Sequence, residues 1–585
     1  MTIISFILFI AIAAVGTWLF VRKSENSSQT GFFLAGRSLT YPLIAASLLL
    51  TNLSTEQMVG LNGSAFRQGL CVMAWEVVAV VSLVAMAWFF LPKFLKSGVA
   101  TVPEYLELRF GKSTGMLANG LFLIFYVVLL LPLILYTGAT ALAQILDFKA
   151  LFNLENKMVI LNLAIWLIGI MGCIYSLIGG LRTCAVLDTI NGIGLLIGGF
   201  MIVFFALNKV GDISGVSGIF SQMKEVGTAD PEMFNTIGRP ASEVPFGTLF
   251  TGVLIINMFY WCTNQQIIQR TLGASSLAEG QKGVLLCGLL KLLGPLYLVI
   301  PGMIAFYFAY KGKINVDMSN SAEAYGQLVT YVLPNWLAGF FAAVLIGAVL
   351  SSFNGALNSS CTLFSIGFYK AHKPDATDKD VIKAGRIFGL VIAIIAMLGA
   401  PLLDKAPSIF DYLQKTNGIY NIPLFAIVVI GMLTCRVPRK GADIALIIGV
   451  VLIAILTFGG SFAEKISCGM NVYHVDTIIF LILCAIMCLW KKRETPFVQE
   501  DVKAVDMTPW KYSWAAGAAL LILVAIIYAS FADFGALKDT KDPVKYRSEL
   551  LVKGKLLNAP ANTVEKAGEA ISQTTDSLQK ALQQK

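Results

Sequence analysis

The residues best suited to chemistry are two adjacent serines inside the apolar run Gly347–Ser365, GAVLSSFNGALNSSCTLFS. On a helix, Ala348, Ser351 and Ser352 share one face, because residues three and four positions apart are neighbours. Two hydroxyls, with a backbone carbonyl freed by a serine-induced distortion, would supply hard and neutral oxygen atoms. Such oxygens suit a monovalent cation, whereas a divalent ion normally requires carboxylates. A serine pair in a transmembrane helix is more often a packing device, so the pair needs a partner elsewhere in the chain.

That partner is predicted in the stretch Thr51–Gln57, TNLSTEQ, which interrupts a second apolar run. In lipid, backbone polar groups must be satisfied, and polar side chains are costly unless they line a cavity. The alternative is that these side chains only bond across helices, but such contacts rarely need the carboxyl of Glu56 and the amide of Gln57. We interpret the interruption as a binding site. Two carbonyls of the unwound stretch would bring the oxygen ligands to about five, enough to replace much of a sodium ion's hydration shell.

The stretch Asn257–Gln266, NMFYWCTNQQ, interrupts a third run in the same way. It lies an odd number of apolar segments after TNLSTEQ, so the two interrupted segments cross the bilayer in opposite directions. Discontinuous helices that meet near the midplane in opposite orientations are typical of inverted-repeat transporters. The repeats are expected at about 41–208 and 247–434.

Membrane-spanning helices must position these stretches, because 57% of the 585 residues are hydrophobic and only 14% are charged. That composition lies outside the range of soluble globular domains. A scan for apolar runs of roughly 18 or more residues predicts about fourteen transmembrane helices. They lie near residues 3–21, 41–64, 71–92, 115–146, 158–179, 184–207, 247–268, 283–310, 335–366, 385–403, 407–434, 442–459, 474–490 and 512–532. We expect one transmembrane domain over 1–535 and a polar, external C-terminal tail over 536–585, whose last part, Asn562–Lys585, is mobile or forms a docking helix.

The formal net charge of +9 reflects membrane topology rather than a binding surface, because Lys and Arg are concentrated in every second loop and not in one patch. The positive-inside rule makes these loops cytoplasmic, and an even number of segments then puts both termini outside. The first apolar run is a retained anchor rather than a secretory signal, because Arg22 and Lys23 follow it and no basic residue precedes it. We expect a multi-pass protein of the cell (inner) membrane, with the lipid bilayer as a partner and no nucleic acid.

Catalytic chemistry is not indicated by the sequence. The ten cysteines are scattered, and the two histidines, His372 and His474, lie in or beside loops without metal-ligand spacing. No nucleotide-binding loop or nucleophile–base pair is present, which argues against an enzyme or an ATP-driven pump. A membrane sensor would require a larger cytoplasmic domain, and a channel would require a continuous polar lining rather than one polar layer.

Several long strings match one family in order, among them FLAGRSLTYPLIAASLLLTNLSTEQMVGLNGSAF, NMFYWCTNQQIIQRTLGASSLAEGQKG and AVLSSFNGALNSSCTLF. The strings AWEVVAV, LLKLLGPLYLVIPG and FDYLQKTNG extend the match, which covers roughly residues 30–440. The chain resembles the solute:sodium symporter family, and within it the sodium/glucose and sodium/galactose cotransporters. The resemblance implies an all-α fold of the leucine-transporter type, with two inverted repeats of five helices each and extra flanking helices.

The resemblance also implies roles for individual residues. The co-transported sodium ion would be held by the carbonyls of Leu50, Leu53 and Ala348 and the hydroxyls of Ser351 and Ser352. A sugar would be bound by Gln57, Glu76, Asn257, Lys291 and Gln414, with Tyr260 stacked on its ring as an inner gate. Asp188 would assist the exit of sodium to the cytoplasm.

The chemistry of these residues suits a neutral polyol, which needs amides, a carboxylate and an ammonium around it. Glu76 and Lys291 could also balance each other's charge. The alternatives are a structural role for Glu76, snorkelling of Lys291 towards the cytoplasm and core packing of Tyr260. For Asn257 and Gln414, an amide that only bonds backbone freed at a helix break is an equally good account.

Two departures from the family pattern bear on the cargo. Sugar transporters of the family carry a polar residue where this chain has Ala79, and relatives that move two sodium ions carry hydroxyl residues where it has Asn354 and Gly355. We expect sodium-coupled import of a neutral monosaccharide by alternating access, with one sodium per sugar. Inositol, sialic acid, a carboxylate or an amino acid are the alternative cargos. An acidic cargo would call for a midplane arginine, and none is expected at the centre of a segment.

Overall fold

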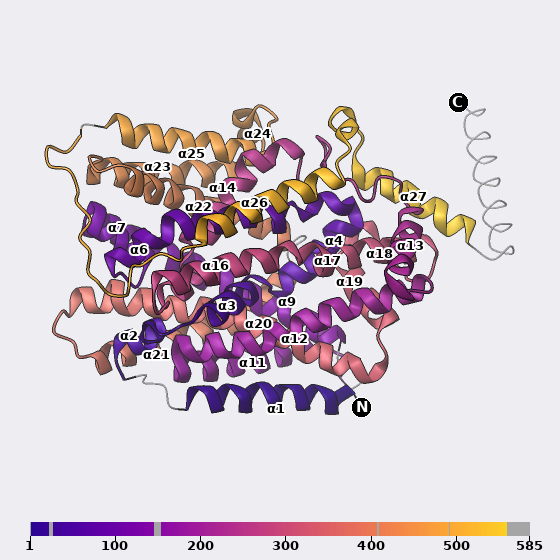
Figure 1. Ribbon diagram of the computed structural model, residues 1–585, viewed down its shortest axis with the longest axis horizontal. Helices are drawn as coiled ribbons and strands as arrows, with labels where there is room; N and C mark the ends of the chain where they lie inside the picture. Colours follow the sequence, from indigo (N-terminus) through magenta and orange to yellow (C-terminus); the bar gives the residue numbers. More distant parts are fainter. Residues whose placement is uncertain (1, 23–26, 146–153, 406–408, 491, 559–585) are drawn as a thin grey trace, which may run out of the picture.

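In the computed structural model the chain is an all-α bundle whose long helices run side by side along its longest axis (Figure 1). The structure describes residues 2–22, 27–145, 154–405, 409–490 and 492–558. Within these ranges there is no β-strand, only two isolated β-bridges. The predicted all-α polytopic fold is confirmed.

The helices of the N-terminal part are α1 (Thr2–Val21), α2 (Gln29–Leu34), α3 (Tyr41–Asn52), α4 (Thr55–Gln68), α5 (Ala74–Ala85), α6 (Leu91–Ser97), α7 (Val102–Phe110), α8 (Lys112–Phe125), α9 (Leu131–Ile145), α11 (Lys157–Cys173), α12 (Gly179–Val210) and α13 (Gly215–Gly227). Single π-helical turns join three pairs of these helices: Met86–Phe90, Tyr126–Leu130 and Ile174–Ile178. The first two pairs each form one long rod with a local bulge, whereas the third is kinked at Gly180 near the start of α12, where φ is 66°.

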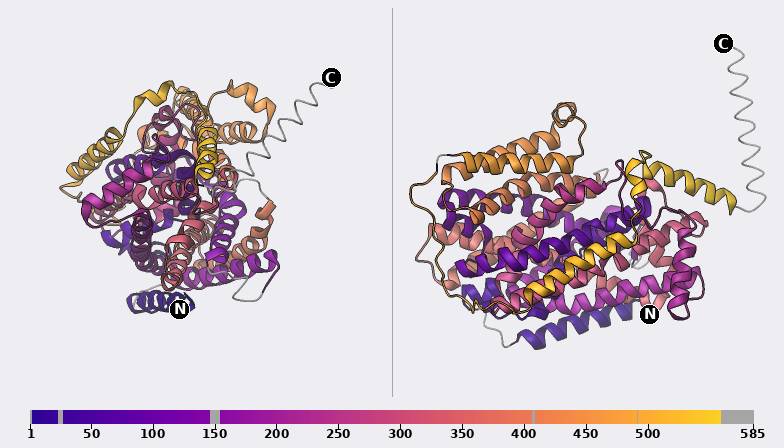
Figure 2. Two further views of the ribbon diagram at one scale, coloured as in Figure 1. Left: turned by 90° about the vertical axis from the view of Figure 1, so that its right-hand side faces the viewer. Right: turned by 45° about the horizontal axis from the view of Figure 1, so that its top comes forward.

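The central helices are α14 (Gly252–Thr263), α15 (Gln265–Leu272), α16 (Leu277–Leu292), α17 (Gly294–Leu298), α18 (Ile300–Tyr310), α19 (Glu323–Val332), α20 (Asn335–Phe364), α21 (Asp378–Gly399) and α22 (Ile409–Leu433). The last helices are α23 (Arg439–Phe458), α24 (Ser461–Ser467), α25 (Val472–Leu489), α26 (Ser513–Ser530) and α27 (Pro543–Leu557). Figure 2 shows α1 at one edge of the bundle and the orange helices α23 and α25 at the opposite edge. The flanking helices therefore enclose the central ones.

Ten helical stretches of the described chain are long and apolar enough to cross a membrane, or eleven if the bent stretch 277–310 counts as one span. The predicted count of fourteen is not reached in this way, for two reasons. The apolar helices Tyr41–Asn52 and Gly252–Thr263 are too short to pass alone, because each is one half of an interrupted helix. The stretches Gln57–Ser97 and Lys157–Val210 are each counted once although each covers parts of two predicted segments, and the second is kinked at Gly180.

The centre of the bundle is formed by α3 and α20. Helix α3 packs against α12, α16 and α20, and α20 also packs against α1, α9 and α12. A glycine allows one of these close approaches, because a Cβ atom at Gly347 would lie 2.6 Å from Cγ of Asn191. Small residues at helix contacts are the usual way in which transmembrane helices come close together. The serine pair of α20 is thereby placed deep inside the protein.

Both predicted interruptions are real breaks in helices. Between α3 and α4, Leu53 leaves the helical conformation and Ser54 caps α4, its Oγ accepting from the N–H of Gln57 at 3.4 Å. Between α14 and α15, Asn264 is extended and its Oδ1 accepts from the N–H of Gln266 at 3.0 Å. Ser and Asn are strong N-cap residues, so each polar stretch starts the second half of its own broken helix.

Part of the predicted C-terminal tail is a packed helix. Helix α27 lies against α4 and α18, at the end of the bundle where α1 begins (Figure 1). Its Arg547 is 2% exposed and donates from Nη1 to the carbonyls of Ala65 and Phe66, at 3.0 and 3.1 Å. These carbonyls belong to the last turn of α4, where acceptors without a helical partner need donors. The predicted docking segment Asn562–Lys585 lies outside the described residues.

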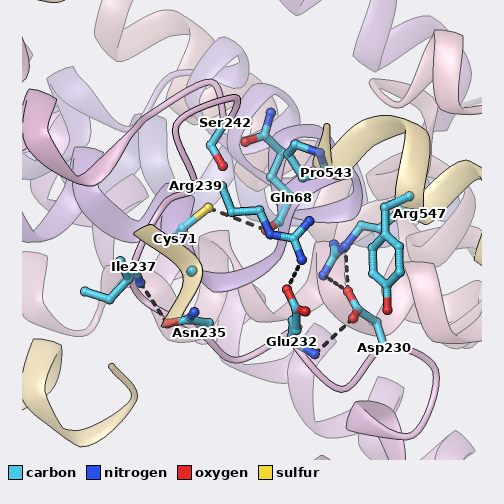
Figure 3. Close-up of a pocket in the computed structure, with 12 residues that line it drawn as sticks. Gln68, Cys71, Asp230, Glu232, Asn235, Ile237, Arg239, Ser242, Pro543 and Arg547 are labelled. Atoms are coloured by element: carbon cyan, nitrogen blue, oxygen red, sulfur yellow. Dashed lines mark hydrogen bonds and ion pairs between the residues drawn. The ribbon is translucent and has the colours of Figure 1, made fainter. Parts of the chain in front are cut away.

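The same guanidinium closes an ion pair with the long loop before α14. Arg547 Nη2 lies 2.6 Å from Oδ2 of Asp230, and both side chains are almost fully buried. Figure 3 shows this pair at one side of a small cavity of about 30 Å³, with Arg239 and Glu232 paired next to it. The C-terminal end of α4 is therefore held by α27 together with the long loop before α14.

Candidate functional site

The predicted cation cage lies where the end of α3 packs against the middle of α20. Its five residues are all buried: Leu50, Leu53, Ala348, Ser351 and Ser352. The Ser352 hydroxyl donates to the carbonyl of Thr51 at 3.1 Å, so the serine pair faces the break in the first interrupted helix. The structure thus brings all five predicted residues to one contact between two helices.

The break itself releases a carbonyl. Leu53 has φ −76° and ψ 67°, the geometry of an inverse γ-turn, and the N–H of Ser54 bonds to the carbonyl of Asn52 at 2.8 Å. In an unbroken helix this N–H would bond to the carbonyl of Leu50, four residues earlier. The Leu50 carbonyl is therefore released from the helical ladder inside the protein. The arrangement offers backbone and hydroxyl oxygens without a carboxylate in the cage, as a monovalent cation prefers.

Asp188 of α12 lies beside the cage, because Ser351 is its neighbour and its partner Ser47 stands one helical turn before Leu50 in α3. Its Oδ2 accepts from the hydroxyl of Ser47 at 2.5 Å and lies 3.7 Å from Nη2 of Arg270, while its Oδ1 has no hydrogen bond within the described residues. Arg270 also donates to Ser47 Oγ at 3.1 Å and to the carbonyl of Gln266 at 2.6 Å. Arg270 was expected in a cytoplasmic loop, but it is fully buried, because α15 carries it into the bundle towards Asp188. Sequence reasoning missed this pair, since the two residues are far apart in the chain.

A cavity of about 140 Å³ adjoins the cage, and both the cage residue Ser352 and its hydrogen-bond partner Thr51 line it. Its volume is that of roughly four to five water molecules at about 30 Å³ each. Seven carboxamide side chains line it: Asn52, Gln57, Asn257, Asn264, Gln266, Asn417 and Asn421. Four aromatic side chains complete much of the wall: Trp75, Tyr260, Trp261 and Tyr420. A pocket with aromatic walls and convergent polar groups is the form expected of a small-molecule site.

The predicted solute-binding residues occupy different places around this cavity. Gln57, Asn257, Lys291 and the predicted gate Tyr260 line it. Glu76 is fully buried and is not among the described lining residues. The side chain of Gln414 lies outside the described residues. Four of the six predicted residues therefore face the cavity, and Glu76 stands behind them.

Glu76 organises two of the lining side chains from this position. Its Oε1 accepts from Nε2 of Gln57 at 2.7 Å, and its Oε2 accepts from Nζ of Lys291 at 2.6 Å. Lys291 also donates to Oδ1 of Asn52 and lies 5.3 Å from the ring centre of Trp261. The lysine is 1% exposed and points into this network, so it does not snorkel to the surface. The carboxylate neutralises the only cation that lines the cavity among the described residues.

Several lining residues were not predicted. Asn264 and Gln266 lie in the interrupted stretch that the sequence singled out, but they received no role there. Asn417 and Asn421 stand four positions apart in α22, so they share a helix face. A pair of amides at this spacing in an apolar segment was the available signal. Asn52 is a further lining residue that was not predicted, and it lies at the break between α3 and α4.

Known proteins resemble this chain over most of its length. A family model described as the sodium:solute symporter family matches residues 32–449. An uncharacterised symporter of Escherichia coli (strain K12), YidK, is 44% identical over 91% of this chain and 91% of its own. A sodium/glucose cotransporter of Vibrio parahaemolyticus is 29% identical over 90% of this chain and 98% of its own. Among solved structures, a sodium-coupled sialic acid symporter in a substrate-bound, outward-open state has a TM-score of 0.68 at 19% identity, covering 84% of this chain and 99% of that one. This last likeness shows a common fold.

Proposed function

The chain belongs to the sodium:solute symporter family, and from this premise we propose that it imports a neutral monosaccharide of the glucose or galactose type together with sodium. It is a multi-span membrane transporter rather than an enzyme, and its fold is of the leucine-transporter type, as expected. Sodium and the solute are both cargo, and no covalent step is needed.

The observation that carries the choice of cargo is the character of the cavity. Seven carboxamides offer donors and acceptors to a polyol, and aromatic rings offer apolar faces to a pyranose. Lys291 is the one cation on the described wall, and its charge is balanced by Glu76 at 2.6 Å. A carboxylate cargo would have to compete with Glu76 for this ammonium. A neutral solute leaves the pair intact.

In this proposal sodium binds to the carbonyls of Leu50, Leu53 and Ala348 and to the hydroxyls of Ser351 and Ser352. The Ser352 oxygen can bind the ion through a lone pair while its hydroxyl proton stays hydrogen-bonded to the carbonyl of Thr51. Bound sodium thereby ties α3 to α20 more tightly. Because Thr51 and Ser352 also form part of the cavity wall, ordering the cage orders the solute site.

The cavity residues Gln57, Asn257 and Lys291 hold the sugar directly, Gln414 adds a further amide, and Glu76 fixes Gln57 and Lys291. Tyr260 closes the cavity as the inner gate, and both cargos leave to the cytoplasm when it moves. Asp188, beside the cage, receives the departing sodium ion. One sodium moves per sugar, since Asn354 and Gly355 provide no second pair of hydroxyls.

We infer the orientation from the ends of the bundle. Helix α1 begins at the same end as α13 and α27 (Figure 1), as an even number of crossings requires. Helix α6, which carries Lys93 and Lys96, and helix α2, whose Gln29 bonds to Lys370, lie at the other end (Figure 1), which the positive-inside rule assigns to the cytoplasm. We infer that both termini face outwards from the cell (inner) membrane.

A second cargo class is favoured by one observation. The structural neighbour is a sodium-coupled sialic acid symporter, and Arg270 supplies a buried guanidinium. However, Arg270 is held by Asp188, Ser47 and the carbonyl of Gln266 and is absent from the described cavity wall. An acidic sugar would have to recruit it from these partners. Inositol, which is neutral, would need no such change.

Uptake into proteoliposomes with an inward sodium gradient tests the proposal. Labelled glucose, galactose, inositol and sialic acid are compared, first in the wild type and then in Gln57→Ala. The proposal expects sodium-dependent uptake of a neutral sugar, and loss of that uptake in the variant. Uptake of sialic acid alone, or of any sugar without sodium, would contradict it. Counting sodium and sugar fluxes together tests the one-to-one ratio.

A further inference from the structure

One side chain, Gln266, touches both the predicted cation cage and the solute cavity. It is 3% exposed and lines the cavity, and its Nε2 donates to the carbonyl of Ser352 at 3.1 Å. Ser352 in turn donates through its hydroxyl to the carbonyl of Thr51 at 3.1 Å. Two hydrogen bonds, joined by the covalent frame of Ser352, therefore link the second interrupted helix to the first through the cage.

The backbone of Gln266 is fixed at the point where α15 begins. Its N–H donates to Oδ1 of Asn264 and to the hydroxyl of Tyr126, both at 3.0 Å, and the Tyr126 hydroxyl donates to Asn264 Oδ1 at 2.5 Å. Its carbonyl accepts from Nη1 of Arg270 at 2.6 Å. The side chain thus extends from an anchored helix end, and its amide joins α15 to the Ser352 carbonyl of α20.

The approach of α15 to α20 depends on the absence of a side chain at one position. A Cβ atom at Gly355 would lie 3.1 Å from Nε2 of Gln266 and 2.8 Å from Nη2 of Arg270. Both distances are too short for unstrained contacts, so Gly355 leaves room for the amide to reach the Ser352 carbonyl. From the sequence, Gly355 was notable only because relatives that move two sodium ions carry a hydroxyl residue at this position.

The amide is also equipped to sense a solute. Its Nε2 is used by Ser352, whereas its Oε1 forms no hydrogen bond within the described residues. A carboxamide oxygen accepts two hydrogen bonds and can therefore receive a sugar hydroxyl from the cavity. Hydrogen bonds in a connected chain polarise one another, so a bond at Oε1 strengthens the donor at Nε2.

We propose that Gln266 is a positioning residue that couples the sodium site to the solute site. This inference rests on the proposed sodium-coupled transport. A solute hydroxyl on Oε1 fixes the amide, the amide fixes the Ser352 carbonyl, and the Ser352 hydroxyl is then held ready for the ion. Sodium binding acts along the same line in reverse, as linkage between two sites requires.

The test measures coupling rather than transport. Equilibrium binding of radioactive sodium to the purified protein is measured with and without saturating D-galactose, and the ratio of the two dissociation constants is the coupling factor. Coupling between sites is typically about 5- to 150-fold. For Gln266→Met, which keeps the size of the side chain but removes both amide atoms, we expect the factor to fall to about one, the value without linkage. Sodium alone should bind within a few-fold of the wild type.

Two further variants separate coupling from folding. Gly355→Ala crowds the Gln266 amide, and Nη2 of Arg270 as well, so it should push the amide away from Ser352 and lose the coupling in the same way. Gln265→Met removes an equally buried amide of the same helix, which bonds to the backbone of Val102 and Ala100 instead, and it should keep the wild-type factor. A wild-type factor in Gln266→Met, or its loss in Gln265→Met as well, would overturn the inference. A wild type without any coupling would instead overturn the proposed function on which it rests.

Discussion

Replacing Ser352 by alanine is the sharpest perturbation of the cation cage, because it deletes one oxygen and little else. The side chain is 1% exposed, and its hydroxyl has one described partner, the carbonyl of Thr51 at 3.1 Å. In the proposed site the variant removes one of about five oxygen ligands of the ion. It also leaves the Thr51 carbonyl buried without its donor.

The size of the effect can be worked out from these two losses. A polar contact to a charged group contributes about 1.5–3 kcal/mol. Since about 1.4 kcal/mol corresponds to tenfold in affinity, the variant should bind sodium about 10- to 140-fold more weakly. The stranded Thr51 carbonyl costs about 1–3 kcal/mol of stability, with or without sodium. Solute affinity measured without sodium should change much less.

The assay is the initial rate of sugar uptake into proteoliposomes as a function of external sodium concentration. A matched control is Ser360→Ala on the same helix, since Ser360 is fully buried but donates only to the carbonyl of Ala356 at 2.8 Å. The half-saturating sodium concentration should rise in Ser352→Ala and stay unchanged in the control. A shift below about twofold in Ser352→Ala, or an equal shift in both variants, would refute the placement of the ion.

Three other predictions concern stability. Glu76→Gln should lower the free energy of unfolding by about 3–5 kcal/mol, because it leaves Lys291 buried without its counter-charge. The double variant Glu76→Gln with Lys291→Met should recover part of the lost thermal stability, but it should not recover transport. Arg547→Ala should cost a similar ~3–5 kcal/mol by stranding Asp230. Arg67→Ala, which breaks the partly exposed ion pair of Arg67 with Glu243, should cost at most about 1 kcal/mol. Melting temperatures in detergent that fall equally in the two variants would argue against a special role for α27. Sodium at about 100 times its dissociation constant should stabilise the folded protein by about 2.7 kcal/mol, and replacing sodium with potassium in a thermal unfolding experiment should remove that gain.

The sequence predicts the parts of this structure that depend on local pattern. The length of the apolar runs identified the helices. The polar stretches Thr51–Gln57 and Asn257–Gln266 marked the two breaks, because polar groups within the bilayer must have hydrogen-bond partners or line a cavity. The serine pair could be placed on one face by helical spacing alone. These are properties of a few neighbouring residues, which a single sequence displays directly.

Features that depend on distant partners could not be predicted in the same way. Arg270 looked like a loop residue because its partner Asp188 is remote in sequence, and only the packing of α15 into the bundle reveals the pair. Glu76 was predicted to touch the solute, whereas it lies behind Gln57 and Lys291 and orients them. Arg547 lies in a polar segment with no visible target, and its role at the end of α4 appears only when the fold is closed.

The two buried ion pairs leave the surroundings of the proposed cargo sites without a net protein charge. Glu76 with Lys291 and Asp188 with Arg270 are each neutral as a pair, and both sit next to the proposed cargo sites. With a neutral sugar, the uncompensated charge that crosses the membrane in one cycle is then that of sodium. The potential contributes about 2.3 kcal/mol per charge for each 100 mV, which corresponds to roughly fifty-fold in sugar concentration at about 1.4 kcal/mol per tenfold. Charges fixed to the protein return to their starting positions after each cycle, so the pairing of Glu76 and Asp188 does not change the charge moved per cycle; it removes the cost of leaving either carboxylate unpaired within the membrane.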